Sequence, residues 1–392
     1  MGKPTYVFTN RVYPPVTGAT GEFLKELAEG LVAEGARVVV VTSRAEEDKR
    51  PKEQKTKGPE VANGVEVIRV GTGRFTRASH WRRAWSYLTL YPRLMWQVWK
   101  LGKVDAVVTM TDPPLQVAAV TLAALRARKK IHWAQDVYPE LAEELGVIPC
   151  GGLLARVLRA VSTRALRQQD RIVAVGRCMR DRLVRRGIDA KKIEVIPNWS
   201  PVAPVSADAA DAMRKKLGWE GKFIALYSGN IGLAHDFETL VEAAKLLEGG
   251  SVTMVFAGEG PRLEEVKRAT RDLGHVLFLP PQPKEELASF LAAADVHLVS
   301  VRAGLEGMVV PSKAYGILAA GRPMIYVGAA DAEIALLVRD TGTGRVVAND
   351  DSATLASLLG KMAETPCSGQ AVVAEEFALP KALKRWEEIL AS

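Results

Sequence analysis

The sequence predicts an α/β protein built from two doubly wound, Rossmann-like domains. Strand-like and helix-like segments alternate along almost all of the 392 residues, and this pattern favours parallel sheets with helices on both faces. A stretch rich in Pro and Ala over residues 197–212 interrupts the alternation and is interpreted as a linker. The same alternation then begins again, which indicates a second domain of the same type.

The first series opens with a short apolar strand, followed by a helix whose apolar residues recur at helical spacing. Its strands are expected at residues 5–9, 37–42, 65–70, 106–110, 130–134, 171–175 and 193–196. Its helices are expected at residues 21–33, 81–99, 115–125, 153–166 and 180–186.

The second series repeats the pattern. Its strands are expected at residues 223–227, 252–256, 276–279, 296–299 and 323–327, and its helices at 237–247, 262–273, 285–293 and from Pro311 to Gly321. The domains are therefore predicted as residues 1–200 and 201–375. A helical segment over residues 376–392, broken at Pro380, is expected to cross back to the first domain.

Composition describes a globular protein of the cytoplasm. Hydrophobic residues make up 48% and charged residues 25%, no apolar run reaches the roughly 20 residues of a membrane span, and the N-terminus lacks the apolar core of a signal peptide. The three cysteines, Cys150, Cys178 and Cys367, are scattered, which fits reduced thiols and neither a disulfide framework nor a zinc site. No metal and no cofactor are expected.

The net charge of +8 is concentrated in one region. Residues 67–104 contain no Asp or Glu and hold half of the eight tryptophans. Basic residues attract anionic surfaces, and Trp favours the boundary between membrane and water. A membrane surface is therefore the expected partner, and an ordinary core helix with a basic face is the alternative. The residues expected at the membrane are Trp81, Arg82, Arg83, Trp85, Trp96 and Trp99. No nucleic-acid-binding signature accompanies them.

Each domain has a glycine turn after its first strand, at residues 13–21 and 227–232, and a third follows at 256–261. Glycine allows backbone amides to approach a diphosphate or a sugar closely. The loop from Gly304 leads into a helix at Pro311 and Ser312, where free amides beside Lys313 would suit a phosphate; a plain capped helix is the alternative. None of the turns forms the dinucleotide fingerprint with its ribose-binding acid, which argues against an NAD enzyme.

Taken together, these motifs resemble the family-4 glycosyltransferases with the GT-B fold, and most of all bacterial enzymes of O-antigen and exopolysaccharide synthesis such as N-acetyl-fucosamine transferases. The matching segments, in chain order, are residues 13–21, 135–139, 196–198, 227–232, 257–261, 294–295 and 306–323. The resemblance implies two domains that face a central cleft, with the acceptor on the first and the nucleotide sugar on the second. It also implies transfer from a UDP-sugar to a polyprenyl diphosphate-linked saccharide at the inner face of the cell membrane, with retention of configuration.

The resemblance also implies which residues form the site. Those expected to be catalytic are Asp136, Gln135 and Glu306. Those expected to contact substrate are Gly18, Ala19, Thr20, Gly229, Asn230, Gly232, His235, Gly258, Glu259, Gly307, Met308, Val309, Ser312 and Lys313.

The chain departs from the family pattern at several of these positions. Asn230 and His235 stand where an Arg and a Lys commonly contact the donor diphosphate, and Met308 and Gly316 stand where two glutamates are common. Gln135 takes the place of a common His. Two other functions therefore stay open: a GT-B sugar-nucleotide epimerase, and a non-catalytic nucleotide-sugar-binding partner of a polysaccharide assembly complex. The sequence leaves the donor sugar, the acceptor and the linkage undetermined.

Overall fold

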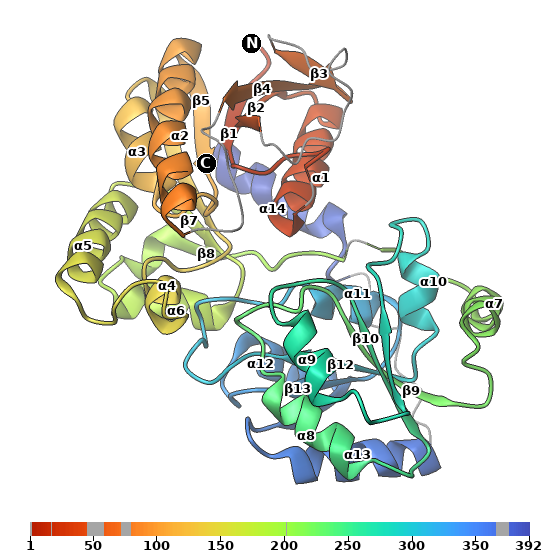
Figure 1. The fold of residues 1–392 in the computed structure, drawn as a ribbon. Coiled ribbons are helices and arrows are strands. Elements are labelled where there is room, and N and C mark those ends of the chain that lie inside the picture. The colour runs from red at the N-terminus through yellow and green to blue at the C-terminus, as the bar shows by residue number, and fades with distance from the viewer. Residues whose placement is uncertain (1, 17, 45–58, 72–79, 201, 366–375) are drawn as a thin grey trace. The chain divides into compact units, whose positions relative to one another are not determined.

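The computed structural model describes residues 2–16, 18–44, 59–71, 80–200, 202–365 and 376–392, with only the backbone described at 80–84. The chain divides into an N-terminal unit, residues 1–197 with 379–392, and a C-terminal unit, residues 198–378. Each unit is built on its own sheet, of eight strands in the first and six in the second (Figure 1). The predicted α/β class with two doubly wound domains is confirmed.

The sheet of the N-terminal unit has the strand order β3-β4-β2-β1-β5-β6-β7-β8. Its strands are β1 (Thr5–Thr9), β2 (Arg37–Arg44), β3 (Glu60–Ala62), β4 (Val65–Gly71), β5 (Val104–Thr109), β6 (Ala127–Ala134), β7 (Arg171–Ala174) and β8 (Ile193–Val195). The expectation of parallel strands alone is wrong at one edge, where β3 pairs antiparallel with β4. Asn63 and Gly64 connect these two strands with positive φ angles of 49° and 82°, the backbone that a two-residue hairpin requires.

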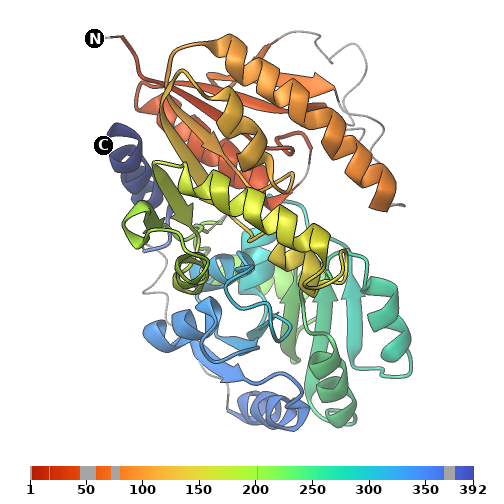
Figure 2. The ribbon, with the colours of Figure 1, turned by 90° about the vertical axis from the view of Figure 1, so that its left-hand side faces the viewer.

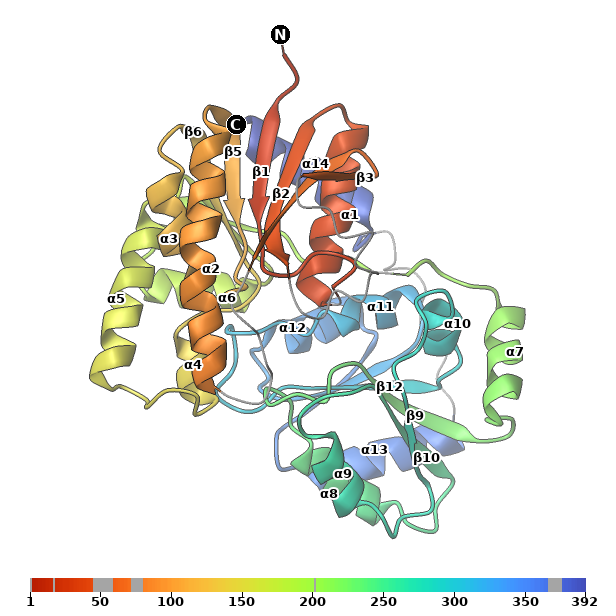
Figure 3. The same cartoon turned by 45° about the horizontal axis from the view of Figure 1, so that its top comes forward.

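Helices cover both faces of this sheet. They are α1 (Ala19–Ala33), α2 (His80–Leu101), α3 (Gln116–Ala123), α4 (Glu140–Glu144), α5 (Leu153–Arg167), α6 (Arg177–Arg185) and α14 (Leu379–Ala391). On one face, Leu90, Leu94 and Val98 of α2 pack against the sheet together with α3. On the other face, α14 lies beside α1 (Figure 3), and its buried Trp386 contacts the rings of Phe8 and Trp133.

Pro380 does not break the C-terminal segment, contrary to expectation. Helix α14 begins at Leu379, so the proline lies in the first turn, where its missing N–H has no intrahelical partner to lose. Helix α1 likewise begins at Ala19, two residues before the predicted start, with Gly18 at its N-cap.

The sheet of the C-terminal unit is parallel and has the order β11-β10-β9-β12-β13-β14, so the order of successive strands reverses between β9 and β12. Its strands are β9 (Phe223–Ser228), β10 (Val252–Ala257), β11 (Val276–Leu279), β12 (Val296–Ser300), β13 (Met324–Val327) and β14 (Gly344–Val347). The edge strand β14 was not predicted. Its exposed Arg345 and the short sequence Gly344–Val347 give little strand signal.

Helices cover both faces of the second sheet as well. They are α7 (Ala207–Leu217), α8 (Glu238–Leu246), α9 (Leu263–Ala269), α10 (Leu287–Ala292), α11 (Lys313–Ala319), α12 (Glu333–Thr341) and α13 (Ser352–Glu364). One core cluster joins α8, α9 and α13 to the sheet, and another joins α7 and α10 to its opposite face. The interpretation of residues 197–212 as a linker is therefore wrong in its second half. Ser206 caps α7 by accepting from the amide of Ala209, and Gly218 ends it in the left-handed conformation.

Candidate functional site

In the C-terminal unit, the loops after β9 and β10 run side by side at the point where the strand order reverses. The amide of Gly229 donates to the carbonyl of Ala257 at 2.9 Å, and the amide of Ile231 donates to the carbonyl of Glu259 at 2.8 Å. A Cβ atom at Gly258 would lie 1.9 Å from the Gly229 carbonyl oxygen. The close contact between the two loops therefore requires a glycine at position 258. This contact holds Gly229 in place.

Gly258→Ala is expected to lower the free energy of unfolding by about 2–5 kcal/mol. The new Cβ meets backbone at a φ of +146°, so both overpacking and backbone strain contribute. Chemical denaturation measures the loss. Gly274→Ala is the control, since a Cβ there meets nothing within 4 Å. Equal stability of the two variants would contradict the loop packing described above.

Lys313, the first residue of α11, is half-buried as a residue, but its Nζ is buried beside Gly229, so it is not a surface lysine. A Cβ at Gly229 would lie 3.5 Å from its Cε, and its Nζ lies 3.3 Å from the centroid of the Tyr227 ring. Among the described residues, this Nζ has no hydrogen-bond partner. Burial lowers the pKa of Lys313 well below its usual range. A buried ammonium with an aromatic face on one side and no anion is suited to receive one.

The helix start at Ser312 offers fewer free amides than expected. The amides of Ala314 and Tyr315 donate to the carbonyls of Pro311 and Ser312 at 3.3 and 3.2 Å, and Ser312 makes no side-chain cap. An anion at this place would therefore depend mainly on the charge of Lys313.

His235 lies near Lys313 as a neutral imidazole. Its Nδ1 is 2.6 Å from the carbonyl oxygen of Ser300, which can only accept, so Nδ1 carries the proton and Nε2 is left as an acceptor. Burial, followed by the charge of Lys313, lowers the pKa of His235 to about 3. His235 therefore does not supply the positive charge that a lysine would supply at this position.

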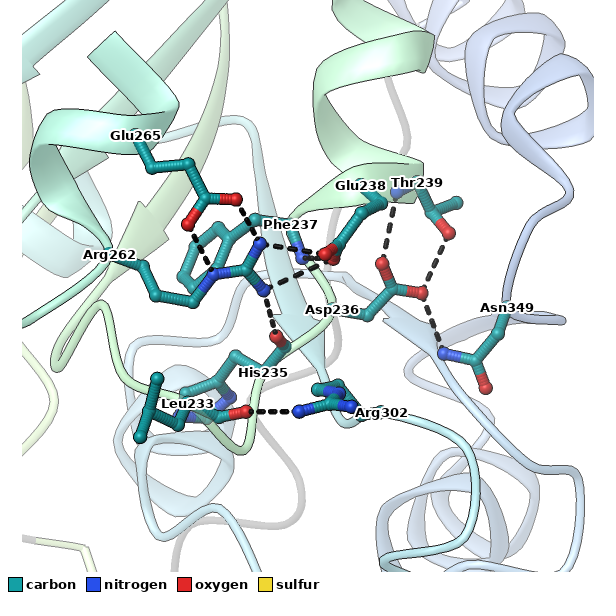
Figure 4. A network of polar contacts seen from close by, with 10 residues as sticks. All are labelled: Leu233, His235, Asp236, Phe237, Glu238, Thr239, Arg262, Glu265, Arg302 and Asn349. Atoms are coloured by element: carbon teal, nitrogen blue, oxygen red, sulfur yellow. Dashed lines mark hydrogen bonds and ion pairs between the residues drawn. The ribbon is translucent and has the colours of Figure 1, made fainter. Parts of the chain in front are cut away.

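A polar network fixes the chain around His235 (Figure 4). The guanidinium of Arg262 donates to the carbonyl of His235 at 3.2 Å and to the carboxylates of Glu238 and Glu265. Asp236, one residue before the N-cap Phe237, accepts from the amide of Thr239 in the first turn of α8 at 3.0 Å. Arg262 was not recognised in the sequence, because its partners come from separate segments.

The remaining predicted residues of this unit lie on the loops around Lys313. Glu306 accepts from the amide of Gly304 at 2.9 Å and so orders its own loop, in which Gly307 and Met308 are buried and Val309 is half-buried. On the other loops, Asn230 and Glu259 are exposed, and the Asn230 amide lies over Gly232.

In the N-terminal unit, the predicted residues follow the ends of β1 and β6. Gly18, Ala19 and Thr20 form the start of α1, where Thr20 accepts from the side chain of Asn10 at 3.3 Å. After β6, the amide of Gln135 donates to the hydroxyl of Thr111 at 2.9 Å.

Asp136 lines a small pocket within this unit, together with His132, Tyr138 and Arg186. Burial, followed by repulsion from Asp112, raises the pKa of Asp136 to about 7, which places its titration near neutral pH. Burial lowers the pKa of His132 to about 4, and its Nδ1 is 3.1 Å from the Thr109 hydroxyl, consistent with a neutral packed histidine. No cluster of metal-ligating side chains occurs among the described residues.

Helix α2 presents aromatic residues to solvent. Trp85, Leu88, Trp96 and Trp99 are all exposed, with Trp85 at 65%, and the rings of Trp96 and Trp99 stack at 5.2 Å. The side chains of Trp81, Arg82 and Arg83 lie outside the described part of the structure. Within the described ranges, no helix is both long and apolar enough to cross a bilayer.

Two doubly wound domains, each with glycine loops at the carboxyl ends of its strands, define the GT-B class of sugar-transferring enzymes. Residues 18–199 match the glycosyl transferase 4-like domain, and residues 222–365 match the glycosyl transferases group 1. WbjE of Pseudomonas aeruginosa, assigned as a glycosyltransferase, is 30% identical over 67% of this chain and 67% of its own. WcaI of Escherichia coli K12, assigned as a glycosyl transferase of colanic acid biosynthesis, is 30% identical over 64% of this chain and 63% of its own. The chain belongs to the family-4 glycosyltransferases with the GT-B fold.

Solved structures share the fold over the whole length. HepE of Anabaena in complex with UDP and glucose has a TM-score of 0.74 at 15% identity, and the match covers 99% of both chains. WaaG, a glycosyltransferase involved in lipopolysaccharide biosynthesis, has a TM-score of 0.67 at 18% identity, over 98% of this chain and 99% of its own.

Proposed function

We propose that this glycosyltransferase moves a sugar from a UDP-sugar to a lipid-linked saccharide in the synthesis of a bacterial cell-surface polysaccharide. The observation that carries the proposal is the Lys313 ammonium, which is buried beside Gly229 without a hydrogen-bond partner among the described residues. The diphosphate of the donor would supply the negatively charged partner that this lysine lacks. The UDP bound to HepE and the assignment of WcaI to colanic acid biosynthesis support the donor and the pathway class.

In this proposal the C-terminal unit binds the donor and the N-terminal unit binds the acceptor. Lys313 stabilises the negative charge that develops on the departing diphosphate, and Glu306 orders the loop that leads to it. Asp136 and Gln135 contact the acceptor, and the sugar is transferred with retention of configuration.

Turnover of UDP-sugars tests the function. The purified protein is incubated with a panel of UDP-sugars and a polyprenyl diphosphate-linked saccharide, and the product and its anomeric configuration are read by mass spectrometry and NMR. An epimerase would convert the donor without acceptor. A non-catalytic partner would bind UDP-sugars and leave them unchanged. Either result would replace the proposed transfer.

We also propose that α2 holds the protein on the inner face of the cell membrane. Replacing Trp85, Trp96 and Trp99 with Ser is expected to lower binding to vesicles about tenfold or more, because interfacial Trp residues contribute buried apolar area. Vesicle co-sedimentation measures this. Val61→Ser with Leu246→Ser is the control, since both residues are exposed on other elements. Unchanged binding by a folded triple variant would rule out α2 as the attachment site.

A further inference from the structure

Helix α5 has three distinct faces. Its buried face, with Ala155, Ser162, Ala165 and Leu166, packs on the unit. A second face is apolar and exposed, with Leu153 at 80% exposure and Leu154, Val157 and Val161 also exposed. The third face is basic and lines an open groove. The residues that line this groove are Arg156, Arg159, Ala160, Thr163, Arg164, Arg167 and Gln168.

The groove is positively charged and contains no acidic side chain among its described lining residues. The surrounding sequence, residues 153–195, has twelve Arg or Lys and four Asp or Glu, which concentrates positive charge in this part of the N-terminal unit. Such a surface attracts anions.

The arginines of the groove differ in whether their guanidinium groups already have partners within the protein. Arg159 is paired with Glu143 and Glu140, and Arg167 donates to the carbonyl of Gly187 at 3.1 Å. Arg156 and Arg164 are exposed and make no ion pair or side-chain hydrogen bond with the described residues. These two guanidinium groups are available for an external anion.

The exposed apolar face beside the groove indicates which kind of anion the groove binds. Contiguous exposed apolar surface marks a protein or membrane interface. Two further apolar side chains are exposed on and just after the neighbouring helix α3, Leu122 and Leu125, the latter at 76% exposure. Helix α3 packs against both α2 and α5, and Figure 2 brings this face of the unit toward the viewer. Apolar side chains beside arginines match an interfacial helix, whose apolar side enters the acyl region while its cations meet the headgroups.

We propose that the α5 groove binds the phosphate groups of anionic phospholipids in a bilayer, with Leu153, Val157 and Val161 in contact with the acyl chains. The proposal rests on the membrane attachment proposed for α2 and adds a second, charge-selective contact to it. It predicts that Arg156 and Arg164 of α5 add to the preference for anionic membranes that the basic residues of 67–104 provide, while the exposed tryptophans of α2 contribute apolar binding.

The test compares the full chain with the variant Arg156→Glu/Arg164→Glu. Wild type is expected to bind mixed phosphatidylglycerol–phosphatidylcholine vesicles more tightly than phosphatidylcholine vesicles. The variant should bind the anionic vesicles about 30-fold more weakly, since each basic residue near an anionic leaflet contributes roughly fivefold. Lys215→Glu/Lys222→Glu makes the same change of charge at exposed sites of the C-terminal unit and should bind as wild type does.

Several results would overturn the inference. These are a loss in the double variant no greater than in its charge control, equal binding of wild type to both kinds of vesicle, and arginine-dependent binding to an oligonucleotide in place of vesicles. UDP affinity is measured in the same variants and is expected to be unchanged. A protein that fails to turn over UDP-sugars while showing arginine-dependent vesicle binding would contradict the transferase proposal and leave the α5 contact supported.

Discussion

Replacing Lys313 with alanine or methionine is expected to lower the affinity for UDP about tenfold or more. A charge-assisted hydrogen bond is worth roughly 1.5–3 kcal/mol, and 1.4 kcal/mol corresponds to a factor of ten in affinity. The neutral His235 does not replace the lost charge, because burial is the main cause that lowers its pKa. Calorimetric titration of UDP and of the UDP-sugar measures the loss.

The stability of the Lys313 variants separates this effect from unfolding. Burial holds the pKa of Lys313 well below its usual range. Between that lowered pKa and about 10.4, the unfolded chain binds a proton that the folded protein has lost, so stability rises with pH in this window. Below the window the folded protein carries an unpaired buried charge. Lys313→Met removes that charge and keeps the contact with Tyr227, so its free energy of unfolding at neutral pH should be unchanged or higher.

Binding of UDP should also be linked to protons. A diphosphate beside Lys313 favours the charged amine and raises its pKa. UDP binding should therefore take up protons and weaken as the pH rises through the lowered pKa, and titrations in buffers of different ionisation enthalpy detect this uptake. Ser312→Ala is the matched control and should lose less affinity, because the Ser312 side chain makes no cap bond. Wild-type affinity in both Lys313 variants would remove this lysine from the donor site.

The order of strands and helices could be predicted from the sequence because it depends on local periodicity. The strands β9, β10 and β12 are short apolar runs followed by glycine or loop residues. Such runs predict buried strands without any knowledge of distant contacts. Helix α7 was not predicted, because its cap at Ser206 and its stop at Gly218 lie in or next to a stretch whose Pro and Ala content is typical of a linker. The β3–β4 hairpin does have a local signal, since Asn63 and Gly64 form the Asn-Gly pair typical of a two-residue turn.

The environment of the candidate site could not be predicted, because it depends on contacts between distant segments. The position of Lys313 suggested a phosphate ligand, but its burial on Tyr227 and the lack of a partner come from the packing of α11 against the loop after β9. The glycines of residues 257–261 suggested ligand contact. In the structure, Gly258 allows the loop after β10 to pack closely against the loop after β9. The titration of Asp136 near neutral pH likewise follows from burial and from Asp112, which no local pattern encodes.

Asp136→Asn is expected to lower kcat/KM for transfer about 10- to 100-fold at pH 8. We propose that the carboxylate accepts a hydrogen bond from the attacking hydroxyl of the acceptor, and losing a charge-assisted bond of about 1.5–3 kcal/mol corresponds to this range. UDP affinity should not change, because the donor site is proposed on the other unit. Asp181→Asn, a change at an exposed aspartate of α6, is the control and should retain full activity.

The activity of the wild-type protein is also expected to depend on pH through Asp136. With a pKa of about 7, Asp136 is protonated below neutral pH and ionised above it. Activity should therefore rise as the pH passes through about 7, and this step should disappear in Asp136→Asn. Since an unfolded Asp ionises near 3.9, the folded protein holds an extra proton between pH 4 and 7 and loses stability as the pH rises there. The Asn variant avoids that loss, so lower activity cannot be ascribed to unfolding.

The size of the Asp136→Asn effect also bears on stereochemistry. In a retaining transfer the departing diphosphate can take the proton of the attacking hydroxyl, so Asp136 has only to orient and polarise that hydroxyl. Removing a true general base typically costs 10²–10⁴-fold, and an inverting displacement needs such a base. A loss far above 100-fold, together with an inverted anomer in the product, would make Asp136 the base and overturn the proposed retention. Full activity with an unaltered pH profile would instead show that Asp136 does not contact the acceptor.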